Sequence, residues 1–200
     1  MNFLHLLTTL PPLLAYLVTF AILVAESGLL IGFFLPGDTL VFPLGLLAAQ
    51  GILSLPIILL VCIAGAVLGD SLGYRIGRTL GPRVFKHQES LFFKKEYVER
   101  AQAFYAKYGK GALVLARFTP VVRTFAPTMA GVAQMDYLVF LTYNVLGGVL
   151  WSVGLVLLGY FLGKVIPNID HYLLPIIALI LVVSLVAPIK HILEARKGKA

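Results

Sequence analysis

In the stretch AESGLLIGFFLPGDTLVFPLG, residues 25–45, a proline and a glycine interrupt a long apolar sequence. An apolar run, 13–35, ends at Pro36-Gly37, and the run that follows, 39–49, is short. A helix needs about 20 residues to cross a membrane. A helix that breaks at Pro-Gly and continues as a short return helix is typical of a re-entrant hairpin. We therefore predict such a hairpin here.

A second stretch, ALVLARFTPVVRTFAPTMAG at residues 112–131, has the same character. Its apolar segment, 111–133, carries Pro120 and Pro127, so we predict a second re-entrant hairpin. At an offset of 84 residues (120 minus 36) the matches are Phe34 with Phe118, Pro36 with Pro120, Pro43 with Pro127, Ala49 with Ala133 and Gln50 with Gln134. Two hairpin-plus-span units that enter from opposite faces form an inverted repeat, as in many secondary transporters.

The composition is that of a membrane protein. Of the 200 residues, 60% are hydrophobic and 12% charged, and the mean hydropathy is +0.95. A soluble domain carries about 25% charged residues. We predict one all-α polytopic membrane domain. Its parts are a first hairpin-plus-span repeat, a cytoplasmic amphipathic segment, a second repeat and a final span, at 12–80, 83–109, 110–163 and 172–189.

The net charge of +7 comes mainly from two basic segments, 75–110 and 190–200. Both flank apolar spans, so the positive-inside rule places them, and the C-terminus, in the cytoplasm. They do not indicate nucleic-acid binding. The first hairpin then enters from outside and the second from the cytoplasm. If 13–35 crosses the membrane fully instead, the N-terminus moves to the cytoplasm.

Four charged residues stand inside these apolar stretches, namely Glu26, Asp38, Arg117 and Arg123. An ion at the membrane centre costs about 3 kcal/mol even on the lenient insertion scale. The four groups therefore pair with each other or face a polar cavity that handles a charged substrate. An arginine fork suits phosphate oxygens, and a buried carboxylate can exchange protons. In the alternative, Glu26 forms a structural ion pair and Asp38 caps the return helix.

Other residues are assigned by position. Pro36, Gly37 and Pro120 open the backbone at the hairpin tips, where free helix ends suit a headgroup. We predict structural roles for Asp70 and Asn144, as partners of neighbouring helices, and for Trp151 in packing. A face of small residues for close helix packing is formed by Gly65, Gly69, Gly73 and Gly77. The sequence has no HExxH, GxSxG or phosphate-loop motif, so we expect no metal, no cofactor and no enzymatic activity.

These motifs together resemble the DedA family of bacterial membrane proteins, which share the SNARE-associated or VTT domain. The resemblance covers about residues 20–165 and rests on Glu26, F-x-P-G-D at 34–38, G-D-x-x-G-Y-x-x-G-R at 69–78, R-F-x-P-x-x-R at 117–123, A-G at 130–131 and N-x-x-G-x-x-x-W at 144–151. It implies two hairpins that meet at the membrane midplane. It also implies lipid transport, with headgroup binding by Arg117 and Arg123 and proton coupling through Glu26 and Asp38.

The leading hypothesis is a proton-coupled transporter of an anionic lipid in the bacterial cytoplasmic membrane. The family resemblance favours undecaprenyl phosphate as the lipid. The alternatives are a phosphatidylethanolamine flippase or scramblase and a proton-coupled small-solute antiporter. The expected partners are the lipid headgroup and protons, and the glycine face would also allow a homodimer.

Overall fold

The computed structural model describes residues 11–28, 37–84, 105, 108–109 and 111–165, and every regular element in these ranges is a helix. The helices are α2 (Pro12–Gly28), α3 (Gly37–Ala49), α4 (Leu55–Val84), α6 (Ala112–Ala116), α7 (Pro120–Val132) and α8 (Tyr137–Val165). The predicted all-α class is thus confirmed for the described residues. Pro36, most of the predicted amphipathic segment and the predicted span 172–189 lie outside them.

Two of the described helices, α4 and α8, are long and apolar enough to cross a membrane. At 1.5 Å per residue, the 25 residues Leu55–Thr79 of α4 extend about 37 Å and the 29 residues of α8 about 43 Å. By the same measure α2, with 17 residues, extends about 26 Å and α3, with 13 residues, about 20 Å. The hydrocarbon core is about 30 Å thick, so α2 and α3 fall short of it.

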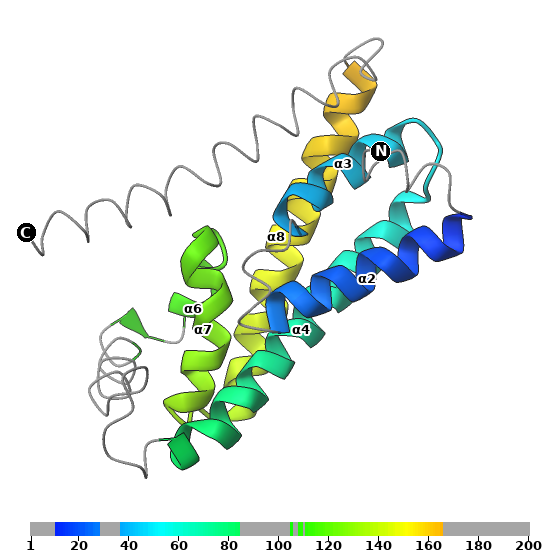
Figure 1. The fold of residues 1–200 in the computed structure, drawn as a ribbon. Helices are drawn as coiled ribbons and strands as arrows, with labels where there is room; N and C mark the ends of the chain where they lie inside the picture. The colour runs from blue at the N-terminus through cyan, green and yellow to red at the C-terminus, as the bar shows by residue number, and fades with distance from the viewer. Residues whose placement is uncertain (1–10, 29–36, 85–104, 106–107, 110, 166–200) are drawn as a thin grey trace, which may run out of the picture.

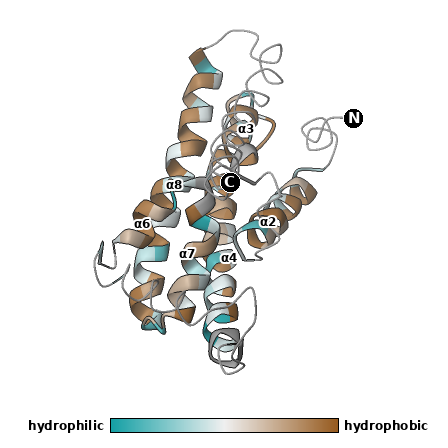
Figure 2. Ribbon diagram, turned by 60° about the vertical axis from the view of Figure 1, so that its left-hand side comes forward, coloured by the Kyte–Doolittle hydropathy of each residue, from teal (hydrophilic) through white to brown (hydrophobic). Residues whose placement is uncertain are grey.

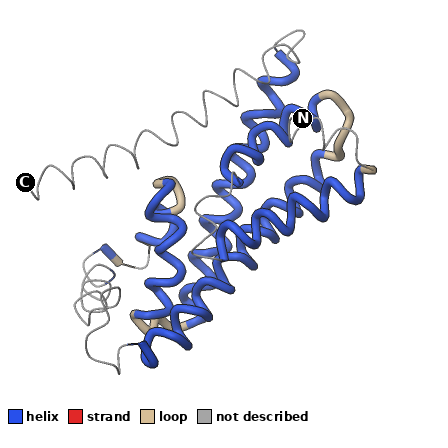
Figure 3. Tube along the Cα trace, in the orientation of Figure 1, coloured by secondary structure: helices blue, strands red, loops and turns tan. Residues whose placement is uncertain are grey.

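The long helices α4 and α8 run in opposite directions and form the centre of the molecule (Figure 1). Each is covered by one helix from each half of the sequence. The first and fourth short helices, α2 and α7, pack on α4, whereas α3 and α6 pack on α8. Apolar residues cover most of every helix (Figure 2). The described connections at 50–54 and 133–136 are short loops (Figure 3).

The break between α6 and α7 follows from Pro120. A proline disfavours helical geometry in the residue before it, and Thr119 is extended, with φ −114° and ψ 109°. Proline is favoured at the first position of a helix, where its missing N–H costs nothing, and α7 begins there. The chain between the two helices therefore holds Arg117 at the end of α6, six residues before Arg123 on α7.

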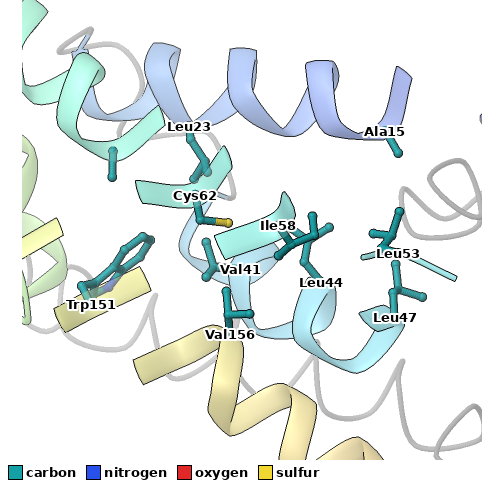
Figure 4. Close-up of a cluster of buried hydrophobic side chains, with 11 residues drawn as sticks. Ala15, Leu23, Val41, Leu44, Leu47, Leu53, Ile58, Cys62, Trp151 and Val156 are labelled. Atoms are coloured by element: carbon teal, nitrogen blue, oxygen red, sulfur yellow. The ribbon is translucent and has the colours of Figure 1, made fainter. Parts of the chain in front are cut away.

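Two apolar clusters hold the helices together. The larger one fills the space between α2, α3, α4 and α8 with aliphatic side chains such as Leu23, Val41 and Ile58, and Trp151 lies at its edge (Figure 4). The smaller cluster stacks Tyr74 of α4 on Phe140 of α8, with ring centroids 4.4 Å apart. The Tyr74 hydroxyl donates to the carbonyl of Met135, which fixes the turn between α7 and α8.

The glycines of α4 lie against two different helices. Gly65 and Gly69 face Leu23 and Ser27 of α2, whereas Gly77 faces the backbone carbonyl of Thr128 on α7. A side chain at Gly77 would collide with that carbonyl. Gly73 lies between these contacts, beside both α2 and α7. Because helices of the same chain cover this face, a homodimer would need another surface.

Candidate charged site between the long helices

Four charged side chains are buried close together where α4, α7 and α8 meet. They are Arg117, Arg123, Glu26 and Asp70, each less than a tenth exposed. Glu26 comes from α2, Asp70 from the middle of α4, Arg117 from the end of α6 and Arg123 from the first turns of α7. Two guanidinium groups and two carboxylates give the set no net charge when all are ionised. This balance lowers the cost of burying them.

Arg117 is held by four acceptors. Its Nη2 donates to Oδ2 of Asp70 at 2.6 Å and to the carbonyl of Ala66 at 3.2 Å. Its Nη1 donates to the carbonyl and to Oδ1 of Asn144, both at 3.4 Å. The side chain therefore ties the end of α6 to α4 and α8 at once.

Arg123 contacts a carboxylate and an aromatic ring. Its Nη2 is 3.4 Å from Oε1 of Glu26, which links α7 to α2. Its guanidinium carbon lies 4.7 Å from the centre of the Trp151 ring, whereas that of Arg117 lies 6.0 Å from the same ring. A cation over an indole face is stabilised by about 2 kcal/mol when both are desolvated. Trp151 thus connects the two ion pairs, in addition to its packing in the apolar cluster.

Asn144 positions this arrangement from α8. Its side-chain amide donates to the carbonyl of Val67 at 3.0 Å and lies 3.5 Å from the Ser71 hydroxyl. Its oxygen atoms meanwhile accept from Arg117. The amide therefore joins α8 to α4 beside the Arg117–Asp70 pair.

Helix α7, which carries Arg123, is also held by Tyr105, a residue that precedes α6 in the chain. The Tyr105 hydroxyl donates to the carbonyl of Ala126 on α7 at 2.7 Å. Burial raises the pKa of Tyr105 above its usual range. The hydroxyl therefore keeps its proton at any working pH and remains a donor to α7.

A small cavity of about 10 Å³ lies between the charged groups. Asp70, Arg117 and Arg123 line it together with Asn144, Tyr143, Gly147, Pro127, Leu113 and Phe140. A cavity of this size holds about one water molecule. The space between these charged groups is therefore too small for a phosphate group.

A larger groove, of about 280 Å³, also has Arg117 in its lining. It follows about two turns of α8 and is otherwise apolar, lined by Phe118, Leu150, Trp151, Gly154, Leu155 and Leu158. Gly154 has no atom near the position of a side chain, which deepens the groove. A polar end at Arg117 and an apolar length beyond it match the shape of an amphiphile.

Three of the four charged residues predicted for the site form ion pairs in the described part of the chain. Glu26 meets Arg123, one of the pairings expected from sequence. Arg117 meets Asp70, for which the sequence indicated only an unspecified helix partner. Gly37 begins α3 and Pro120 begins α7. The Asp38 side chain lies outside the described residues. No three His, Cys, Asp or Glu side chains gather as metal ligands in the part of the chain that the structure describes.

Comparisons with known proteins give one consistent result. The VTT domain matches residues 35–161. Protein DedA of Escherichia coli is 37% identical over 187 residues, which cover 92% of this chain and 85% of that protein. An uncharacterized membrane protein of Mycobacterium tuberculosis is 49% identical over 162 residues, 80% of this chain and 70% of that protein. Inner membrane protein YqjA of Escherichia coli is 38% identical over 149 residues, 74% of this chain and 68% of that protein. No solved structure matches significantly.

Proposed function

The chain belongs to the VTT-domain family, that of the DedA membrane proteins, and we propose that it transports an anionic lipid across the cytoplasmic membrane. The observation that carries this proposal is the placement of Arg117. Its guanidinium is buried beside a second arginine, and it also forms the polar end of an apolar groove. One residue thus faces both a polar site and a surface suited to a hydrocarbon tail.

Phosphate is the headgroup chemistry that this site favours. Arginine stays charged at any working pH, and its planar fork donates two parallel hydrogen bonds to phosphate oxygens. Arg117 and Arg123 line the same small cavity, so one phosphate could contact both once the cavity opens. Undecaprenyl phosphate is the lipid that the family resemblance favours. Phosphatidylethanolamine, which also carries a phosphate, is the alternative.

The groove favours a lipid over a small solute. A solute such as inorganic phosphate would need only the polar cavity. The apolar side chains that line the groove, such as Phe118 and Leu158, would add no favourable contact to such a solute. A proton-coupled small-solute antiporter remains the second candidate, since it would use the same buried charges.

The packing of the helices supports an inverted repeat. Each return helix crosses the long helix of the other half: α3 crosses α8 and α7 crosses α4. At both crossings a backbone carbonyl of the short helix meets a glycine, Phe42 with Gly159 and Thr128 with Gly77. We propose that α2–α3 and α6–α7 are re-entrant hairpins that enter from opposite faces. The basic segment 75–110, which begins in the last turns of α4, and the C-terminus would then be cytoplasmic in a multi-pass protein.

Lipid flipping in proteoliposomes tests the role of the arginines. With a fluorescent polyprenyl phosphate as the probe, we expect Arg117→Ala to slow flipping at least about tenfold. A hydrogen bond to an ion contributes about 1.5–3 kcal/mol. Arg117→Lys keeps the charge beside Asp70 but loses the fork, and we expect it to be impaired as well.

The matched control is Arg75→Ala, which removes the same charge from an exposed position of α4. It should flip at the wild-type rate. Wild-type flipping by both Arg117→Ala and Arg123→Ala would reject headgroup binding. Transport of inorganic phosphate or of cations without flipping would favour the antiporter. For proton coupling, Glu26→Gln should reduce the dependence of flipping on a proton gradient, and an unchanged dependence would reject coupling through Glu26.

A further inference from the structure

In the described site, the protein already engages the two terminal nitrogens that form the fork of Arg117. Both terminal nitrogens already donate to protein oxygens, and the shortest of these bonds, 2.6 Å, goes to Asp70. The two carbonyls and the Asn144 amide cannot change charge. Of the four acceptors, only the Asp70 carboxylate can take a proton, and protonation removes the negative charge that holds the guanidinium.

The position of Asp70 is also suited to competition with a phosphate. Asp70 lies in the middle of α4, a long helix packed by α2, α7 and α8, so its backbone is held in place. Its side chain lines the same cavity as Arg117 and Arg123. A carboxylate oxygen that bonds a guanidinium stands where a phosphate oxygen would stand, because the two anions use the same donors. The cavity has no room for both.

We propose that Asp70 is a gate for the substrate phosphate: ionised, it occupies Arg117, and protonated, it releases Arg117 to the lipid headgroup. This inference rests on the proposed function and adds a second proton-exchanging carboxylate to Glu26 at the same site. One proton is taken up on the carboxylate oxygen as the phosphate binds, and it leaves when the phosphate departs. No covalent bond changes.

The charged and titratable groups around Asp70 come from every helix packed there. Arg117 comes from the end of α6, Arg123 from α7 and Tyr143 from α8, all lining the same cavity. Tyr74 lies one turn further along α4, and Glu26 of α2 faces the set through Arg123. Glu26 is therefore the other carboxylate whose protonation would affect binding, and it needs its own variant.

The direction of the pH effect on binding distinguishes protonation of Asp70 from protonation of the phosphate ligand. Acidification protonates Asp70 and should tighten binding of a phosphate lipid. A phosphate monoester loses negative charge on acidification, since its second pKa is about 6, and by itself it should bind more weakly. The two effects run in opposite directions.

The experiment measures binding of farnesyl phosphate to the full-length purified protein by calorimetry, between about pH 8 and about pH 6. Farnesol and inorganic phosphate serve as probes of the tail alone and the headgroup alone. We expect wild-type binding to tighten on acidification. Asp70→Asn mimics the protonated side chain and should bind about tenfold more tightly than wild type at the higher pH, equal to about 1.4 kcal/mol. It should also lose the tightening on acidification.

Three further variants make the result decisive. Asp136→Asn changes an exposed aspartate that caps α8 with hydrogen bonds to Leu138 and Val139, and it should behave as wild type. Asp70→Glu keeps a titratable carboxylate, so it should retain the tightening on acidification even if the fold is weakened. Glu26→Gln should retain it too, since Asp70 remains.

Two outcomes would overturn the gate. In the first, Asp70→Asn binds farnesyl phosphate no more tightly than wild type at the higher pH. In the second, Asp70→Asn keeps the wild-type response of binding to pH. A different outcome would overturn the proposed function itself. In that case neither wild type nor Asp70→Asn would bind farnesyl phosphate more tightly than farnesol at any pH.

Discussion

Arg117 and Arg123 are both buried, but they contact different groups. Arg117 has four acceptors on α4 and α8, whereas Arg123 has Glu26 on one side and the ring of Trp151 on the other. Removing one partner of a buried ion pair leaves an uncompensated charge, which costs about 3–5 kcal/mol. Replacing both partners removes that cost.

A double-mutant cycle on the Glu26–Arg123 pair follows from this. We expect Glu26→Gln alone to lower the free energy of unfolding by about 3 kcal/mol, because it removes the carboxylate charge 3.4 Å from the buried Arg123 guanidinium. Glu26→Gln combined with Arg123→Gln should recover a large part of the loss. The measurement is unfolding of the detergent-solubilised protein, with Arg75→Gln as the control. Losses that simply add would contradict a direct interaction.

The sequence predicted that charged side chains would lie inside the apolar bundle, because burying them has a known cost. It could not predict which carboxylate meets which arginine. Arg117 and Asp70 are 47 residues apart and join only because α6 ends beside the middle of α4. A periodic pattern within one helix carries no information on that crossing. Trp151 was expected to pack, and its contact with two cations depends on the same crossing.

Among the helices, the closest contacts are made where a short helix crosses a long one at a glycine. The spacing of glycines in α4 predicted close packing, and the ends of the long helices were predicted within a few residues. The sequence placed their apolar parts at 55–79 and 137–163, and the helices end at Val84 and Val165. Which helix covers which glycine is a tertiary property that repeating glycines do not encode.

A pair of glycine variants tests these crossings. In Gly77→Ala, the new methyl group collides with the Thr128 carbonyl, so α7 must move away from α4. We expect a loss of about 1–3 kcal/mol in the free energy of unfolding, as in other overpacked contacts. Gly154→Ala is the matched control, because no atom lies near its side-chain position. It should be neutral or more stable, since alanine favours helix over glycine. Equal losses in both variants would reject the crossing.

In the described part of the molecule, two long helices and four short ones surround a site that holds two arginines and two carboxylates. The two antiparallel long helices are the candidate membrane spans (Figure 1). Three shorter helices bring Glu26, Arg117 and Arg123 beside Asp70 of α4. The small polar cavity and the larger apolar groove both have Arg117 in their lining. If the protein transports a phosphate lipid as proposed, these ion pairs must open before the phosphate binds between the arginines.

The central claim is that a lipid phosphate binds between Arg117 and Arg123 while its tail lies in the groove along α8. Electron cryo-microscopy of the full-length protein in nanodiscs with undecaprenyl phosphate tests it most directly. We predict headgroup density within hydrogen-bonding distance, about 3 Å, of both guanidinium groups, with tail density beside Leu150 and Leu158. Well-resolved lipid density elsewhere, with Arg117 still bound to Asp70 and Arg123 to Glu26, would contradict the account.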